Sequence, residues 1–359
     1  MKNSHLLLAI DLGASGTKIV GSIVGEAGCK AGLMTPHCIE VDGALDREPL
    51  FDRHNVWVKI GAKSYAVGNL AHIKYEATNK LKPAKFTTAV PKICAAIAVA
   101  AQAFALPAKF DLSISFVLPP AEWEQASIVI ERLQTALKDL ETPKGKIKPR
   151  LLNITPYPEG TGILLGQDLD LKNILGAVTV VMLGFRNASV LSSTKGVIAR
   201  PNTNDLGFHD LLMSITSKSG YKIDDIIEPV VYYKQTKDSK WLNPILRCTG
   251  ADRQTELDGL IQSIDSADKE YWTKLTDWLD EAMPNHSSFV CFSGGTTNYF
   301  KSDLEQYAKT KMEYDENRLR WHTKVELPKN CGMSDNRFND IYILWSELNK
   351  STLNKPVTA

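Results

Sequence analysis

The most constraining feature of the sequence is a glycine-rich turn close to its start. An apolar run at residues 6–10 leads into Asp-Leu-Gly-Ala-Ser-Gly-Thr-Lys at residues 11–18, and a second apolar run continues to residue 24. Continuous apolar runs are typical of strands that are buried on both faces. The pattern therefore predicts a β-hairpin. A Walker loop or a dinucleotide-binding turn opens a helix instead, and neither GxxxxGKS/T nor GxGxxG occurs here.

The residues of this turn suit an anion. Gly13 and Gly16 permit positive φ, so that successive backbone N–H groups can turn inward and form an anion-binding nest. Ser15, Thr17 and Lys18 add two hydroxyl donors and a positive charge. Asp11, at the end of a predicted strand, is placed to hold a hydrated magnesium ion, which usually takes one or two protein carboxylates. Taken alone, the pattern equally describes an ordinary hairpin with solvated polar residues.

A second glycine turn lies far along the chain. Phe-Ser-Gly-Gly-Thr-Thr at residues 292–297 separates a predicted strand, 288–292, from a predicted helix, 299–309. Gly294 and Gly295 allow a ligand to approach the backbone closely at a helix N-terminus.

Length and composition exclude several classes of protein. A chain of 359 residues suits two domains. The 42 basic and 41 acidic residues leave no case for extensive direct DNA contact. The six cysteines form no CxxC pair, which argues against a disulfide framework or a zinc site. The longest apolar stretch, 93–106, is too short to span a membrane. We expect a cytoplasmic protein.

The second half of the chain repeats the order of elements in the first. A strand at 177–183, a turn at 184–187 and a strand at 188–192 form another predicted hairpin. Helices are expected at 206–217, over most of 223–284 and at 339–348, whereas 153–162 is rich in proline and glycine and is expected to be a loop. Two halves that each begin with a hairpin and end in helices suggest an internal structural duplication.

The order and spacing of these motifs resemble the superfamily of actin, sugar kinases and chaperones. Residues 11–18 resemble its first phosphate motif and residues 293–297 its adenosine motif. Within it, the chain is most similar to the ParM/StbA branch of bacterial actin-like proteins. Segments 67–71, 86–99, 117–119 and 335–343 add to the similarity, which covers residues 6–347. The resemblance implies an α/β, actin-like, duplicated ribonuclease H-like fold with nucleotide in the cleft between two domains, at residues 1–175 plus 333–359 and 176–332.

The resemblance also implies a role for each motif residue. The phosphates of ATP or GTP would be bound by Gly13, Ala14, Ser15, Gly16, Thr17 and Lys18, with Mg²⁺ near Asp11. Further nucleotide contacts would come from Gly184, Asn187, Gly207, Gly294, Gly295, Thr296 and Thr297. Glu159 aligns with the family residue that orients the attacking water. The alternative for Glu159 is a solvent-exposed loop glutamate.

One position departs from the family pattern. The second phosphate motif normally begins with an aspartate, but this sequence has Met182 there, followed by Leu183 and Gly184. A thioether cannot hold a magnesium-bound water or polarise a nucleophile. Arg186 and Asn187 could donate to phosphate oxygens instead. We therefore expect nucleotide binding with slow or altered hydrolysis.

The leading functional hypothesis is a protein that forms ATP-dependent filaments by head-to-tail stacking. The resemblance implies a role in plasmid or DNA segregation through a DNA-binding adaptor protein, with no direct DNA contact and no membrane. One alternative is a small-molecule, sugar-type kinase, for which Asp205 or Asp210 would have to serve as the base. Another is a nucleotide-dependent scaffold or sensor without turnover.

Overall fold

The chain folds into two compact units. The computed structural model describes residues 4–42, 45, 55–78, 84–199, 201–310, 313, 317–323 and 336–354. Unit 1 comprises residues 1–169 and 322–359, and unit 2 comprises residues 170–321. The boundaries predicted from the sequence fall six residues later at the first crossing between the units and eleven residues later at the second.

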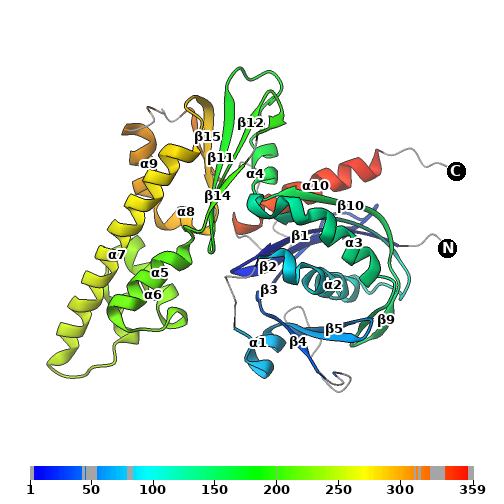
Figure 1. The fold of residues 1–359 in the computed structure, drawn as a ribbon, viewed down its shortest axis with the longest axis horizontal. Coiled ribbons are helices and arrows are strands. Elements are labelled where there is room, and N and C mark those ends of the chain that lie inside the picture. Colours follow the sequence, from blue (N-terminus) through cyan, green and yellow to red (C-terminus); the bar gives the residue numbers. More distant parts are fainter. Residues whose placement is uncertain are drawn as a thin grey trace. The chain divides into compact units, whose positions relative to one another are not determined.

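Unit 1 is built on two five-stranded sheets (Figure 1). The first has the order β10-β7-β1-β2-β3, and its strands are β1 (His5–Gly13), β2 (Gly16–Ile23), β3 (Lys30–Met34), β7 (Asp111–Leu118) and β10 (Arg150–Pro158). The second has the order β4-β6-β5-β8-β9, and its strands are β4 (Cys38–Val41), β5 (Asn55–Ile60), β6 (Lys63–Gly68), β8 (Leu140–Thr142) and β9 (Gly145–Ile147).

Helices cover both faces of the first sheet. Unit 1 contains α1 (Asn69–Tyr75), α2 (Phe86–Ala103), α3 (Ala126–Ala136), α4 (Thr161–Leu165) and α10 (Asn339–Leu353), with short 3₁₀ turns at Pro120–Gln125 and Asn336–Phe338. Leu6 and Leu8 of β1 belong to the core cluster that contains α2 and α3, whereas Leu7 and Ala9 belong to the cluster that contains α10. Successive side chains of a strand point to opposite faces, so a sheet covered twice requires the unbroken apolar run seen in the sequence.

Unit 2 has one sheet with the order β13-β12-β11-β15-β16, and β14 also pairs with β12. Its strands are β11 (Ala177–Leu183), β12 (Ala188–Thr194), β13 (Val197–Ile198), β14 (Asn202–Asn204), β15 (Ser287–Ser293) and β16 (Leu319–Trp321). Its helices are α5 (Phe208–Ser219), α6 (Ile223–Thr236), α7 (Asp252–Ala282), α8 (Gly295–Tyr299) and α9 (Lys301–Thr310), with 3₁₀ turns at Ser239–Trp241 and Asn243–Ile245. Helix α5 ends at Gly220, which takes a positive φ of 71°.

The two main sheets share one topology. In each, an antiparallel hairpin (β1 with β2, β11 with β12) is extended by two parallel strands on the side of its first strand. A third strand pairs with the second strand of each hairpin on the other side. This correspondence supports the structural duplication that the sequence suggested.

The prediction of a loop at residues 153–162 is wrong for most of its length. Strand β10 continues to Pro158 and pairs in parallel with β7. The loop was predicted because of Pro156 and Pro158, since proline interrupts a central strand. Strand β10 is the edge of its sheet, and an edge strand tolerates a missing N–H donor.

Helix α2 is a core element. Among the described residues it is the one helix with the length and apolar composition of a membrane span, and most of it is buried. Its residues Ile93, Cys94 and Ile97 are fully buried in the larger core cluster of unit 1. The helix begins at Phe86, and Pro91 lies in its second turn.

Candidate functional site

Asp11 and Glu159 lie on the side of the first sheet where its parallel strands have their carboxyl ends. Strands β1, β7 and β10 are parallel, so their carboxyl ends meet at one edge, where ligands of open α/β sheets usually bind. Asp11 is opposite Val117 of β7, and the N–H of Glu159 donates to the carbonyl of Leu118 at 2.9 Å. The two carboxylates predicted to act on a nucleotide are thus separated in the sheet by a single strand.

The turn that joins β1 to β2 is tight. Gly13 pairs with Gly16, which leaves Ala14 and the exposed Ser15 as the two turn residues. Neither Gly13 nor Gly16 takes the positive φ that glycine permits. Space requires these glycines instead: a Cβ on Gly13 would lie 2.8 Å from the Gly16 carbonyl oxygen, and one on Gly16 would lie 2.6 Å from Leu33.

Beside the turn, the side chain of Asp11 is 14% exposed. One of its carboxylate oxygens forms an ion pair with the ammonium of Lys18. Burial opposes ionisation, but the ammonium groups of Lys18 and Lys85 outweigh it and keep the pKa of Asp11 below its ordinary value. Within the part of the chain that the structure describes, the buried atoms Asp11 Oδ1 and Thr17 Oγ1 have no hydrogen-bond partner. Buried polar atoms of this kind are rare in native proteins and are expected to have a ligand, an ion or a water.

Glu159 is not the solvent-exposed loop residue of the alternative interpretation. Its side chain is 14% exposed and forms an ion pair with Lys85, which is 9% exposed. Burial disfavours the charged form of Lys85, but the carboxylates of Glu159 and Asp11 outweigh it and raise its pKa. Lys85 immediately precedes α2, and Lys92 lies two turns further along the same helix. Burial lowers the pKa of Lys92 to about 8.

The backbone that carries Glu159 is held by a third carboxylate. Asp340, at the start of α10, accepts hydrogen bonds from the N–H groups of Gly160 at 2.9 Å and Ile163 at 3.2 Å. Burial raises the pKa of Asp340 to about 6, although these two N–H groups favour its charged form. Gly162 permits the contact, because a Cβ there would lie 2.0 Å from the Asp340 carbonyl oxygen. Helix α10 thus fixes the segment that presents Glu159.

Unit 2 places Met182 where unit 1 has Asp11. Both residues precede a Leu-Gly pair at the end of the first hairpin strand. Asp11 is paired with Lys18, whereas Met182 is opposite Ser189 on β12 and Ser293 on β15. Asn187 closes the hairpin turn through its carbonyl, which accepts from the N–H of Gly184 at 2.9 Å. The counterpart of the Asp11–Lys18 ion pair in unit 2 is therefore uncharged.

The second glycine turn is packed against the end of β11. Gly294 has a φ of 99°, and a Cβ on it would lie 2.3 Å from the Leu183 carbonyl oxygen. Thr296 donates to the carbonyl of Gly184 at 2.9 Å, and Thr297 donates to that of Ser293 at 2.7 Å. Both threonines are buried, whereas Gly295 is exposed at the start of α8. The threonine hydroxyls therefore hold the turn in place, and the exposed backbone of Gly295 is its accessible part.

Gly207 has a packing role that the sequence did not reveal. It precedes α5 in an extended conformation, and a Cβ on it would lie 2.1 Å from the carbonyl carbon of Arg186. The N–H groups of Phe208 and His209 donate to the carbonyls of Gly184 and Phe185 at 3.1 and 2.8 Å. Gly207 thus joins the start of α5 to the β11–β12 turn.

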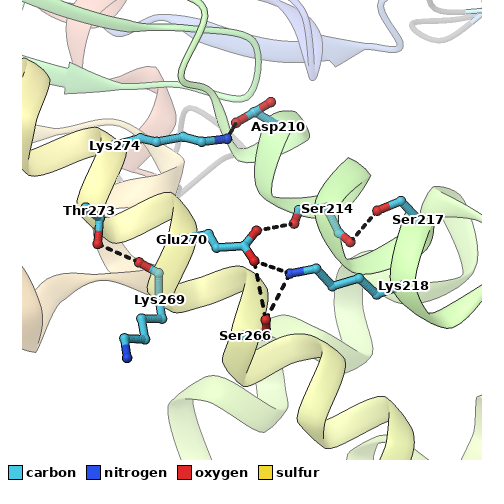
Figure 2. A network of polar contacts seen from close by, with 9 residues as sticks. All are labelled: Asp210, Ser214, Ser217, Lys218, Ser266, Lys269, Glu270, Thr273 and Lys274. Atoms are coloured by element: carbon cyan, nitrogen blue, oxygen red, sulfur yellow. Dashed lines mark hydrogen bonds and ion pairs between the residues drawn. The ribbon is translucent and has the colours of Figure 1, made fainter.

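Neither aspartate required by the kinase alternative lies in a catalytic arrangement. Asp210 faces Lys274 of α7 at 4.0 Å, beside the contacts of Glu270 with Ser214, Lys218 and Ser266 (Figure 2). These residues join α5 to α7 at the protein surface. Asp205 is exposed, and its carbonyl accepts from the N–H of Gly207 at 2.8 Å.

Solved structures resemble this chain over nearly its full length. Bacillus thuringiensis ParM with ATP is 15% identical, with 98% of this chain and 100% of that chain covered and a TM-score of 0.60. An archaeal actin homologue is 14% identical, with 96% and 99% covered and a TM-score of 0.62. The chain has a ParM-like actin fold. The Alp12 filament structure agrees, at 15% identity, 97% and 99% coverage and a TM-score of 0.59. No protein-family model and no curated protein sequence matches.

The actin-like fold implies a magnesium ion beside the nucleotide, and the residues of unit 1 fit one. Asp11 Oδ1 is a buried carboxylate oxygen that accepts no hydrogen bond from the described residues, which suits a metal-bound water. In the described ranges, no group of three or more His, Cys, Asp and Glu side chains could enclose a metal ion. Magnesium at phosphate sites does not need such a cage, because the phosphates complete its coordination.

Sequence motifs did not reveal Lys85, Lys92 or Asp340. Lys92 lies within the segment 86–99 that supported the family resemblance, and Lys85 directly precedes that segment. Asp340 falls within the segment 335–343 that supported the family resemblance, although residue 335 lies outside the described residues. The spacing of seven between the lysines, which places both on one face of a helix, was the available signal.

Proposed function

We propose that this chain binds ATP, or GTP, through residues of both units. The observation that carries the proposal lies at the carboxyl end of β1, where Thr17 Oγ1 and Asp11 Oδ1 have no hydrogen-bond partner among the described residues and lie next to Lys18. These groups suit the phosphates and their metal. Structures of Bacillus thuringiensis ParM with ATP, AMPPNP and ADP support the proposal. In unit 2, residues 184–187, 207 and 294–297 are proposed to contact the rest of the nucleotide.

The proposed reaction is slow hydrolysis of the terminal phosphoanhydride bond. Glu159 accepts a hydrogen bond from water and orients it for in-line attack, while Lys18 and Thr17 donate to phosphate oxygens. Magnesium, when bound at Asp11, would neutralise phosphate charge. Met182 offers no acceptor at the position where the resemblance expects a second acid. Nucleotide binding therefore persists in this proposal while turnover is slow.

We further propose that nucleotide binding drives head-to-tail filaments of this chain. The Alp12 filament structure supports self-association. Plasmid or DNA segregation in the cytoplasm through a DNA-binding adaptor protein follows from the family resemblance. The near balance of 42 basic and 41 acidic residues agrees with an indirect contact to DNA.

The kinase alternative is not favoured, because Asp210 lies in a surface network and Asp205 is exposed. A nucleotide-dependent scaffold without turnover is the second candidate, and Met182 is the observation that favours it.

Pelleting and light scattering with ATP, ADP and a non-hydrolysable analogue, coupled to phosphate release, test these functions. Polymer that requires ATP supports the filament proposal. Nucleotide binding without polymer or turnover favours the scaffold. Hexose-dependent ADP production without polymer would overturn both in favour of a kinase.

A further inference from the structure

Lys85 has hydrogen-bonding capacity that the described residues do not use. A lysine ammonium carries three N–H donors. Within the described ranges Lys85 makes one side-chain hydrogen bond, to Glu159. Its side chain is 9% exposed, so little water reaches the remaining donors. A nearly buried ammonium with spare donors favours an anionic ligand.

The acidic groups around Lys85 already have other partners. Asp11 forms an ion pair with Lys18, and Glu122 accepts from the N–H of Phe86 at 2.9 Å. Lys92 contributes a further positive charge within electrostatic range of both Lys85 and Asp11. The helix that begins at Phe86 therefore supplies two ammonium groups near the phosphate turn, and only one of them has an ion pair among the described residues.

Lys85 also interacts with residues at the carboxyl ends of both β1 and β10. Its ammonium contacts Glu159, at the end of β10, and lies within electrostatic range of Asp11, at the end of β1. In the proposed function, the terminal phosphate lies between the phosphate turn and the water held by Glu159. The position of Lys85 is therefore suited to the terminal phosphate and not to the nucleoside.

We propose that Lys85 is a specificity-determining residue that binds the γ-phosphate and makes this chain prefer nucleoside triphosphates to diphosphates. This inference rests on the proposed nucleotide binding. When a triphosphate binds, its terminal oxygens accept hydrogen bonds from the N–H donors of Lys85 that Glu159 does not use. The negative charge of these oxygens also weakens the ion pair between Lys85 and Glu159. Glu159 is then released to accept from water. With a diphosphate bound, Lys85 stays with Glu159, and its contribution to affinity is absent.

Equilibrium binding of ATP, of a non-hydrolysable ATP analogue and of ADP to the full chain tests this assignment. The Lys85→Met variant removes the ammonium but keeps a long apolar side chain. We expect its affinity for ATP and the analogue to fall about tenfold or more, as for the loss of a charge-assisted hydrogen bond. Its affinity for ADP should change less than about threefold. The exposed Lys138→Met in the same unit is the matched control and should change neither affinity.

A second variant separates the loss of the ammonium from the effect of an unpaired buried carboxylate on folding. Lys85→Met leaves Glu159 buried without its cation, whereas Lys85→Met combined with Glu159→Gln removes both charges. The double variant should show the same selective loss of triphosphate affinity. Equal losses for ATP and ADP, or no loss, in a folded variant would overturn the assignment. Wild-type protein that binds neither nucleotide would instead overturn the proposed function, and this inference with it.

Discussion

At the scale of single residues, the phosphate turn depends on the absence of a Cβ atom at Gly13. Beyond the short distance to Gly16, a Cβ on Gly13 would lie 3.1 Å from Lys18 Nζ and 3.4 Å from Asp11 Oδ1. The same glycine therefore lets the hairpin close and leaves room for the ion pair beside it. Its backbone conformation is open to other residues, so space alone excludes them.

We predict that Gly13→Ala displaces this turn, costs about 1–3 kcal/mol of folding stability and abolishes nucleotide binding. Denaturant unfolding and equilibrium binding measure the two effects. Gly32→Ala in β3 is the control, because its Cβ would have no atom within 4 Å and its φ is not positive. A Gly13→Ala protein that binds ATP like wild type would contradict the proposed phosphate site.

Met182 gives a second prediction at this scale. An acid there would face Ser189 and Ser293 across the sheet, in the position that Asp11 occupies in unit 1. Met182→Asp should raise the rate of phosphate release by about tenfold or more, because a hydrogen-bond acceptor in position for proton transfer contributes at least that much. Met182→Leu is the matched control. Unchanged turnover in Met182→Asp would show that the missing acid does not limit hydrolysis.

At the scale of elements, one carboxylate anchors the start of α7 to the segment before it. Glu256 accepts from the N–H groups of Cys248 at 2.7 Å and Arg247 at 2.9 Å, and from the Tyr221 hydroxyl at 2.7 Å. Together with the Arg247 guanidinium at 3.0 Å, these donors favour the carboxylate. Led by the Cys248 N–H, they lower the pKa of Glu256 to about 2.

This contact predicts a pH-dependent loss of stability in unit 2. A lowered folded-state pKa stabilises the fold above the unfolded value near 4.5, and the contribution disappears as pH falls toward 2. Glu256→Gln should therefore unfold more readily than wild type at pH 7, with a difference that narrows below pH 4.5. Denaturant unfolding across this range measures it, with the exposed Glu281→Gln of the same helix as control. A difference independent of pH would contradict the assignment.

At the scale of the whole molecule, the proposed binding residues divide between the two compact units. Residues 11–18 and 159 belong to unit 1, and residues 184–187, 207 and 294–297 belong to unit 2. A ligand that binds only the folded state stabilises it by about 2.7 kcal/mol at 100 times its Kd.

We therefore predict that ATP raises the melting temperature and that a substitution in either unit removes this effect. Gly13→Ala tests unit 1, and Gly294→Ala tests unit 2, because its Cβ would meet the Leu183 backbone at positive φ. Gly32→Ala should keep the full shift. Thermal unfolding at increasing ATP concentration measures the shift. An undiminished shift in Gly294→Ala would show that unit 1 binds the nucleotide alone.

Much of this architecture could be predicted because local signals agreed with it. The apolar runs of β1 and β11 have a local cause in burial, and Gly220 at the end of α5 has one in its positive φ. Strand β10 was missed because its prolines are acceptable only at a sheet edge, and edge position is a property of the assembled sheet.

The sequence by itself determined that the chain has two halves that each begin with a hairpin. It also determined the positions of the glycine turns and the presence of Met182 in place of an acid. These properties depend on residue type and order along the chain. Only the tertiary structure decided that Gly13 is required because a Cβ atom there would clash, that Lys85 pairs with Glu159 and that Asp340 holds the Glu159 segment. Lys85 and Glu159 are 74 positions apart, and Gly160 and Asp340 are 180 apart. The physical reason is that such contacts come from parallel strand order and packed helices, which no local pattern encodes.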